Sequence, residues 1–275
     1  MNISVVGLGL IGASLAKALK KRTNHTVFGF DVDESVLNDA LNDKAIDEIG
    51  NDKILSKSDL VIVALYPQAT IEFVTNKARI FKKNAVVIDT CGIKQNVCKA
   101  LSEVALNNEF TFVGAHPMAG KETSGYYSSD ADLFTNAYMI LTPTMEDINA
   151  VTMLTELSEQ LGFKSITLST PLEHDRIIAY TSQLPHVLAC AYISDPDAIK
   201  HDGFSAGSYK DVSRVAQINA KMWTELFIEN RDCLCGHITK LIDNLTKLRE
   251  YISSQNCDML EKTLDNGDKI KKRIG

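Results

Sequence analysis

In the first part of the chain, short runs rich in β-branched residues alternate with longer segments of helical period. The runs predict strands at residues 3–6, 27–30, 59–65, 85–88, 110–113, 138–141 and 165–168. Segments 10–21, 94–106 and 147–161 carry apolar residues at helical spacing, and Pro67 is placed to begin another helix. Apolar strands separated by helices are typical of a parallel sheet covered on both faces.

The pattern changes near Ser169, beyond which the spacing is helical. We predict helices over residues 171–194, 212–217, 221–255 and 258–270, the third long and amphipathic. The sequence therefore predicts an α/β protein with two tightly packed domains: a sheet domain over residues 1–169 and an all-helical domain over residues 170–275.

Composition is that of an ordinary globular protein. Hydrophobic residues make up 45% and charged residues 23% of the 275 positions, which excludes disordered, collagen-like and coiled-coil chains. The formal net charge is −6, and such an acidic chain is a poor nucleic-acid binder because phosphate neutralisation supplies most of that affinity. We expect a small-molecule partner and no nucleic acid.

Several features argue against a membrane, secreted or metal-binding protein. The sequence has no run of about 18 apolar residues and no N-terminal signal pattern. Its six scattered cysteines indicate free thiols, so we expect a cytoplasmic protein. We expect no metal site, because Cys235 on a helix points away from the face that Cys233 and His237 share.

Residues 7–12 (GLGLIG) follow the first predicted strand and begin the first predicted helix. Gly7 permits a tight turn, Gly9 lets the backbone approach a pyrophosphate, and Gly12 lets the helix lie close to the strand. The helix N-terminus then faces the phosphates with free N–H groups. Asp31, at the end of the next strand, would accept ribose hydroxyls and repel a 2′-phosphate. The pattern predicts a Rossmann-type domain that binds NAD rather than NADP.

Ligands of such sheets bind at the carboxyl ends of the strands. The cofactor-binding residues predicted from the glycine turn and these ends are Gly7, Gly9, Leu10, Ile11, Gly12, Asp31, Leu65, Tyr66 and Thr90. His116 follows the predicted strand 110–113, and histidine is suited to proton transfer near neutral pH. His116 is therefore the predicted catalytic residue, the alternative being a histidine that caps a loop.

Five segments resemble the prephenate and arogenate dehydrogenase family. They are residues 114–125 (GAHPMAGKETSG), 89–94 (DTCGIK), 182–186 (SQLPH), 207–214 (GSYKDVSR) and the pair Met222-Trp223. The resemblance covers nearly the whole chain and implies an NAD-binding domain followed by a helical dimerisation domain. The implied reaction is the NAD-dependent oxidative decarboxylation of prephenate to 4-hydroxyphenylpyruvate in tyrosine biosynthesis, or of arogenate to tyrosine.

The resemblance also implies roles for individual residues. His116 falls on the catalytic histidine, which hydrogen-bonds the C4 hydroxyl of prephenate. Arg214 falls on an arginine that binds a substrate carboxylate, and His186 falls on a histidine that lines the substrate pocket. From the residues alone, Arg214 could equally form an ion pair with an acid such as Asp211.

Three further positions on the substrate side depart from the family pattern. Gly92 stands where some members carry a serine that helps to hold the histidine and the substrate. Gln183 replaces the first histidine of the SQLPH segment, and Lys121 stands where others often have threonine. These departures concern substrate anchoring and the choice between prephenate and arogenate, and they leave the hydride chemistry untouched.

Two other functions fit part of the pattern. A β-hydroxyacid dehydrogenase has the same architecture, but it places a catalytic lysine early in the second domain, and residues 171–194 contain no lysine. A non-catalytic NAD-binding sensor has no need of both His116 and Arg214.

The roles of two other features stay open. Cys91 is either a reactive thiol or a small packing residue. His174-Asp175 either is part of a relay or places an acid in a first helical turn.

The apolar stripe over residues 226–248 predicts a homodimer that buries it. Because the sequence stops soon after the last predicted helix, we expect neither an appended regulatory module nor a chorismate mutase domain.

Overall fold

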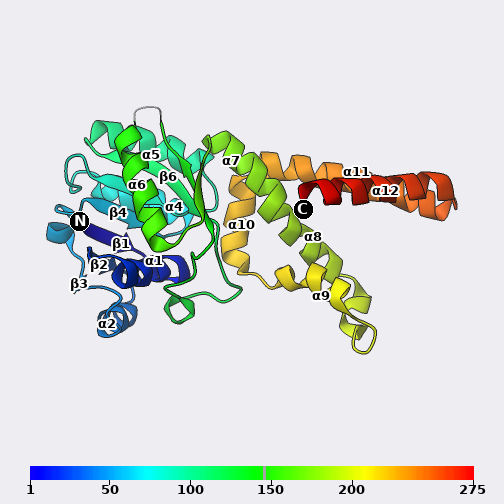
Figure 1. Cartoon of the computed structure of the whole chain (residues 1–275), viewed down its shortest axis with the longest axis horizontal. Helices are drawn as coiled ribbons and strands as arrows, with labels where there is room; N and C mark the ends of the chain where they lie inside the picture. Colours follow the sequence, from blue (N-terminus) through cyan, green and yellow to red (C-terminus); the bar gives the residue numbers. More distant parts are fainter. Residues whose placement is uncertain (145–146) are drawn as a thin grey trace.

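The computed structural model describes residues 1–144 and 147–275, and shows a body built around a sheet from which long helices project (Figure 1). The strands are β1 (Asn2–Val6), β2 (Thr26–Phe30), β3 (Glu48–Ile49), β4 (Leu60–Val63), β5 (Val86–Asp89), β6 (Thr111–Pro117), β7 (Tyr138–Thr142) and β8 (Ser165–Leu168). They form one sheet in the order β3-β2-β1-β4-β5-β6-β7-β8.

Strands β1 to β6 pair in parallel. The sequence pattern predicts this pairing for all of them except β3, which it does not contain. The prediction of an entirely parallel sheet is wrong at one edge, because β7 runs antiparallel to β6 and β8 follows β7 in parallel. Residues 118–137, which join β6 to β7, contain the short helix η1 (Tyr126–Ser128) and no crossover helix. A parallel return needs such a crossover, so β7 starts at the end of the sheet where β6 stops.

Helices cover both faces of the sheet (Figure 1). Helices α1 (Leu10–Arg22), α2 (Glu34–Asn42) and α6 (Ile148–Leu161) pack on one face, and α3 (Asp52–Leu55), α4 (Pro67–Lys77) and α5 (Gln95–Asn107) on the other. Successive residues of β4 supply the two cores in turn, Leu60 and Ile62 to the first, and Val61 and Val63 to the second. The short elements α2, β3 and α3 are absent from the predicted pattern.

The helical part begins with α7 (Pro171–Ile178), a π-helical turn η2 (Ala179–Gln183) and α8 (Leu184–Ile193), where one helix is predicted. Pro185 has no N–H to bond the carbonyl of Thr181, and a widened turn relieves this break in the ladder. The next elements are short: η3 (Pro196–Lys200), α9 (Gly207–Ser213) and η4 (Arg214–Ala216).

The prediction of one helix over residues 221–255 is wrong, because the chain breaks between α10 (Ala220–Glu229) and α11 (Arg231–Ser253). At the break, the buried Asn230 side chain donates hydrogen bonds to the carbonyl of Asp175 (2.8 Å) and to Oε1 of Gln183 (2.9 Å). These bonds lie across the domain interior, so the helical period of the sequence does not reveal them.

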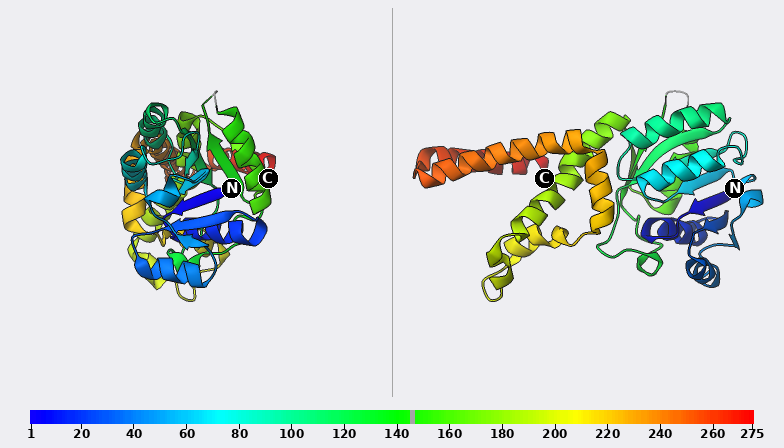
Figure 2. Two further views of the ribbon diagram at one scale, coloured as in Figure 1. Left: turned by 90° about the vertical axis from the view of Figure 1, so that its left-hand side faces the viewer. Right: turned by 180° about the vertical axis from the view of Figure 1, so that it is seen from behind.

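Helices α11 and α12 (Cys257–Ile274) form a hairpin that projects away from the sheet domain (Figure 2). None of the helices in the part of the chain that the structure describes is long and apolar enough to cross a membrane.

Carboxylates of the helical part connect it to the sheet domain. Asp175 of α7 accepts the backbone N–H groups of Lys94 and Gln95 where α5 begins, and Glu225 of α10 accepts the N–H of Gln68 in the first turn of α4 (2.9 Å). Acidic groups are stabilised there because free N–H groups and the positive end of the helix dipole face them. These contacts hold the helical part against the carboxyl ends of the strands.

Candidate functional site

The turn between β1 and α1 can be built only with glycine at two positions. Gly7 has a φ of +86°, and a Cβ there would lie 2.6 Å from the carbonyl oxygen of Ala64. A Cβ on Gly12 would lie 1.8 Å from the carbonyl oxygen of Gly7. By contrast, no described atom lies within 4 Å of a Cβ built on Gly9, so the space in front of α1 is open.

The same turn offers donors and an acceptor to a dinucleotide. Among the described residues, no side chain caps the N-terminus of α1, where Leu10 and Ile11 are half-buried. Asp31 directly follows β2, and its carboxylate accepts the N–H groups of Leu8 (2.7 Å) and Asp33 (3.0 Å). The glycine turn, the uncapped helix and the fixed carboxylate together fit a nucleotide with a pyrophosphate and a free ribose.

The other predicted cofactor residues lie along the same edge of the sheet. Leu65 and Tyr66 follow β4, and Thr90 follows β5, whose neighbours are β4 and β6. Tyr66 is partly exposed at the start of α4, and the N–H of Thr90 bonds the carbonyl of Val63 (3.1 Å). The carboxyl ends of adjacent parallel strands meet at one edge, which places these residues beside the glycine turn.

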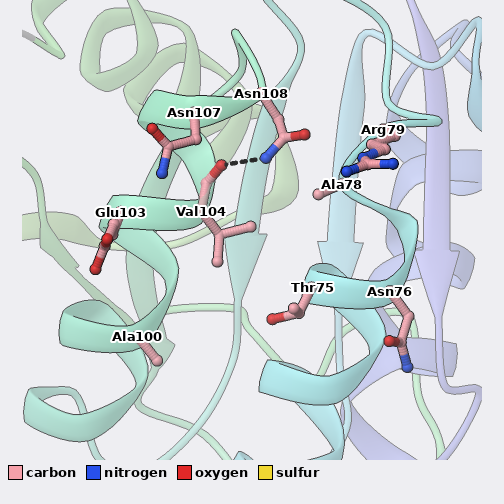
Figure 3. A pocket seen from close by; sticks show the side chains of 9 residues that line it. All are labelled: Thr75, Asn76, Ala78, Arg79, Ala100, Glu103, Val104, Asn107 and Asn108. Carbon is pink, nitrogen blue, oxygen red and sulfur yellow. Dashed lines mark hydrogen bonds between the residues drawn. The ribbon is translucent and has the colours of Figure 1, made fainter.

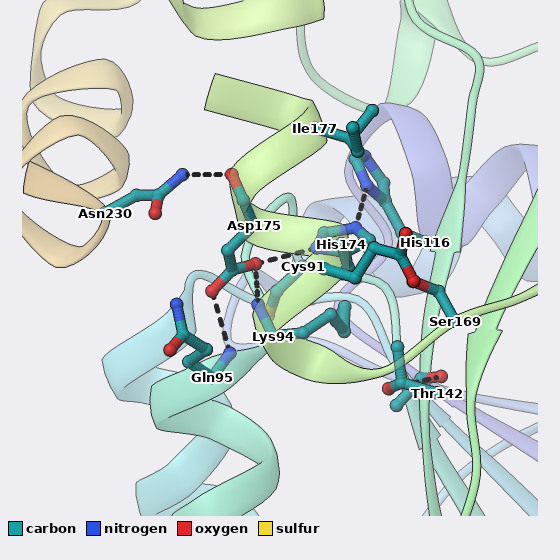
Figure 4. Close-up of polar contacts among 12 residues, drawn as sticks. Cys91, Lys94, Gln95, His116, Thr142, Ser169, His174, Asp175, Ile177 and Asn230 are labelled. Atoms are coloured by element: carbon teal, nitrogen blue, oxygen red, sulfur yellow. Dashed lines mark hydrogen bonds and ion pairs between the residues drawn. The ribbon is translucent and has the colours of Figure 1, made fainter. Parts of the chain in front are cut away.

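His116 lies within the end of β6 rather than in the loop after it. Its Nδ1 is 2.9 Å from Nε2 of His174, and Nδ1 of His174 is 2.7 Å from Oδ1 of Asp175 (Figure 4). Burial lowers the pKa of His116 well below 6.5, and the neighbouring His174 and Lys94 lower it further. The pKa of His174 is also lowered, mainly by burial. Both rings are therefore neutral near pH 7, as a general base must be.

A buried ion pair lies beneath this chain of rings. Lys94 and Asp89 are fully buried and contact each other directly. The Asp89 carboxylate also accepts the N–H groups of Cys91 (2.9 Å) and of Ala115 (3.0 Å), the residue before His116. The pair thereby fixes the β6 backbone that carries His116.

Sequence reasoning left His174 and Asp175 undecided and gave Lys94 and Asp89 no separate role. A His-Asp dipeptide in a first helical turn is compatible with many arrangements. What selects this one is the packing of α7 against β6 and α5, which no local motif records.

Two residues predicted on the substrate side, Gly92 and His186, lie next to side chains of α10. A Cβ built on Gly92 would be 3.7 Å from Leu226 of α10 and 3.9 Å from Cε1 of His116, so a side chain would fit there. One α-helical turn away, Trp223 lies against His186 with ring centroids 3.9 Å apart. Nδ1 of His186 donates to the carbonyl of Val215 (2.7 Å), next to Arg214. Helix α10 therefore connects the His116 end of the site to the Arg214 end.

Arg214 pairs with Glu122 (2.6 Å), and not with Asp211 as the alternative interpretation has it. Both side chains are partly exposed. Lys121 bonds within its own loop, to the carbonyl of Ser128 (3.1 Å) and to Asp130 (3.4 Å). Its contact with substrate stays a prediction.

Gln183 is almost completely buried, and its amide contacts the interior of the helical part. Its Nε2 donates to the carbonyl of Leu226 (3.2 Å), and its Oε1 accepts from Asn230 (2.9 Å). Gln183 thus holds the end of α10 through these two hydrogen bonds, and its direct contact with substrate stays a prediction.

Cys91 is buried against Thr70 and the carbonyl of Leu65. Burial raises the pKa of its thiol far above the usual range, which makes it a packing residue rather than a reactive thiol. Among the described residues, no group of three or more His, Cys, Asp or Glu side chains is arranged to hold a metal ion.

A shallow groove of about 510 Å³ lies elsewhere, between the C-terminal halves of α4 and α5 (Figure 3). It is lined by residues such as Arg79, Glu103 and Asn107. Because α4 and α5 begin at the carboxyl edge of the sheet, this groove lies at the opposite end of both helices from His116.

Comparison with known proteins covers both parts of the chain. Residues 15–167 match the family model described as prephenate dehydrogenase, nucleotide-binding domain. Residues 170–266 match the model described as prephenate dehydrogenase, dimerization domain.

Individual relatives are similar over nearly their whole length. A cyclohexadienyl dehydrogenase of Zymomonas mobilis is 32% identical, over 94% of this chain and 91% of the relative. The structure of Synechocystis arogenate dehydrogenase is 30% identical, with a TM-score of 0.84 and coverage of 98% and 99% of the two chains. The structure of A. aeolicus prephenate dehydrogenase with hydroxyphenyl propionate and NAD⁺ is 26% identical, with a TM-score of 0.89 and coverage of 100% and 98%.

Proposed function

The chain belongs to the prephenate dehydrogenase family, and we propose that it catalyses the NAD-dependent oxidative decarboxylation of prephenate to 4-hydroxyphenylpyruvate in tyrosine biosynthesis. The observation that carries this proposal is the position of His116. Its neutral, half-buried imidazole lies at the carboxyl ends of the strands, where the glycine turn for the nucleotide also lies. Arogenate is the second candidate substrate, because the 30% identical Synechocystis structure is an arogenate dehydrogenase.

NAD fits the glycine turn, with its pyrophosphate at the N-terminus of α1 and its adenosine ribose on Asp31. When bound, it supplies the acceptor for the hydride that leaves C4 of the substrate. The Asp31 carboxylate lies where NADP would carry its 2′-phosphate, which supports the preference for NAD.

His116 is the proposed general base. As the C4 hydrogen leaves with its electron pair, positive charge develops on C4, and Nε2 of His116 accepts the proton of the C4 hydroxyl. The C1–carboxylate bond then breaks, CO₂ leaves, and its electron pair completes the aromatic ring. His116 returns the proton to the phenolate oxygen, so the step consumes no net acid or base. Such proton transfer contributes about 10²–10⁴-fold to the rate.

The substrate carboxylates require a positively charged partner. Arg214 offers a planar guanidinium that can bind both oxygens of a carboxylate. Its pair with Glu122 joins the helical part to the loop after β6, which carries His116. His186, whose Nδ1 is bound by Val215, has Nε2 left for the substrate. Gly92 leaves the space beside His116 in which the ring hydroxyl would lie.

We further propose a cytoplasmic homodimer in which residues 1–169 bind NAD and residues 170–275 bind substrate and dimerise. Partly exposed apolar residues on the projecting hairpin support the dimer, including Leu245 and Ile252 on α11 and Leu264 and Ile270 on α12. A second copy would bury this surface, which a lone chain leaves in water.

The test is a matrix of initial rates with prephenate or arogenate and NAD or NADP, followed at 340 nm. We expect the highest kcat/KM with prephenate and NAD. Higher kcat/KM with arogenate would assign the second candidate, and absence of turnover with both substrates would reject the family's activity for this chain.

A further inference from the structure

We infer that His174 and Asp175 are positioning residues that fix which nitrogen of His116 carries the proton. The inference rests on the proposed function for its consequence in catalysis. The tautomer itself is a property of the protein alone, and it can be measured without substrate.

The argument follows the direction of each hydrogen bond. The Asp175 carboxylate can only accept, so Nδ1 of His174 donates to it. A neutral His174 then has a lone pair on Nε2, and Nδ1 of His116 must donate to that atom. His116 is thereby held with its proton on Nδ1 and its lone pair on Nε2. Only this tautomer can accept a hydroxyl proton at Nε2.

Asp175 cannot turn to offer another arrangement. Its Oδ1 accepts the N–H of Lys94 (2.7 Å), and its Oδ2 accepts the N–H of Gln95 (2.9 Å), both at the beginning of α5. The residue is buried, as is His174. The two N–H donors stabilise the ionised carboxylate, so the orientation of the chain of rings is set by a helix N-terminus in the other domain.

Few charged groups act on this chain. Lys94 and Asp89 face it from the start of α5 and the end of β5, and the thiols of Cys98 on α5 and Cys233 on α11 lie near Asp175. The Lys94 ammonium opposes a positive charge on either ring, whereas Asp175 favours one. When His116 accepts the substrate proton, its ring becomes positively charged, and Asp175 stabilises this charge through His174.

The substitution Asp175→Asn reverses the whole chain. We expect the amide oxygen to stay on the N–H of Gln95 and the NH2 to replace Oδ1, where it gives up the N–H of Lys94 and donates to Nδ1 of His174. Nε2 of His174 then carries the proton and donates to Nδ1 of His116. Nε2 of His116 is then protonated and cannot act as a base. In a serine-protease triad the equivalent change lowers kcat about 10⁴-fold, and with one more ring between carboxylate and base we expect a loss of about 10²–10⁴-fold. KM for prephenate and affinity for NAD should stay within about twofold of wild type, because Asp175 contacts neither.

A matched pair at position 174 separates orientation from packing. His174→Gln keeps an acceptor for Nδ1 of His116, whereas His174→Met has the same length and lacks a strong one. We expect the Gln variant to retain a kcat about tenfold or more above that of the Met variant. Equal kcat for the two variants would mean that His174 only fills space, and would overturn the inference.

The deciding measurement is ¹⁵N NMR of the histidine rings in the full-length protein at pH 7.5, with His116→Asn used to assign the signals. Wild type should show His116 with its proton on Nδ1, and Asp175→Asn should show the proton on Nε2. A wild-type proton on Nε2, or an unchanged tautomer in the variant, would overturn the inference whatever the enzyme's activity. The predicted tautomers without turnover of prephenate or arogenate would uphold it and reject the proposed function alone.

Discussion

Lys94→Met should destabilise the protein strongly, because it removes one charge of a buried ion pair. Lys94 and Asp89 are both fully buried and form an ion pair inside the sheet domain. The substitution keeps most of the volume of the side chain and removes its charge, so the Asp89 carboxylate is left buried without a counter-ion.

The magnitude follows from what remains around Asp89. Removal of one partner from a buried ion pair costs about 3–5 kcal/mol. Asp89 keeps two backbone donors, Cys91 and Ala115, so we expect a loss near the lower limit, about 3 kcal/mol in the free energy of unfolding. At about 2–4 °C per kcal/mol for a protein of this size, Tm should fall by about 6–12 °C.

Thermal unfolding followed by circular dichroism measures the effect. The double variant Asp89→Asn/Lys94→Met removes both charges of the pair, so it should recover most of the lost stability, to within about 1 kcal/mol of wild type. Because Lys94 lowers the pKa of His116, the acid limb of the kcat/KM profile should also move to higher pH in Lys94→Met. An unchanged Tm in the single variant, or a double variant less stable than the single, would refute the reasoning.

Four other expectations concern the site and its pH dependence. His116→Asn should lower kcat by about 10²–10⁴-fold while prephenate and NAD still bind, and near-normal turnover would remove its role as base. Arg214→Ala should raise KM for prephenate about tenfold or more, and an unchanged KM would mean that the carboxylate is held elsewhere. Asp31→Ala should relax the preference for NAD, and a wild type that already prefers NADP would contradict the cofactor assignment. Because burial lowers the pKa values of His116 and His174, the unfolded chain binds more protons below about pH 6.5, so Tm should fall as pH drops from 7 to 5.5; His116→Asn should show a smaller fall, and an equal one would contradict this origin.

The sequence was sufficient for features that depend on local pattern. Strands β1, β2, β4, β5 and β6 and helices α1 and α5 follow from apolar runs and helical period. The turn at residues 7–12 follows from glycines without which the backbone could not close. His116 could be found because its motif follows a strand, and the carboxyl ends of parallel strands converge at one edge. In each case the residues that specify the feature are close together in the chain.

Tertiary structure decided everything that depends on distant residues meeting. The reversal of β7, the break of the long helix at Asn230 and the orientation of His116 through His174 and Asp175 all arise from hydrogen bonds between segments far apart in sequence. A strand has the same side-chain alternation whichever way it runs, and a His-Asp pair has the same letters wherever its helix packs. The direction of β7, the partner of the His-Asp pair and the tautomer of His116 are therefore set only in the folded protein. There the domains pack together, and each buried hydrogen-bond donor needs an acceptor.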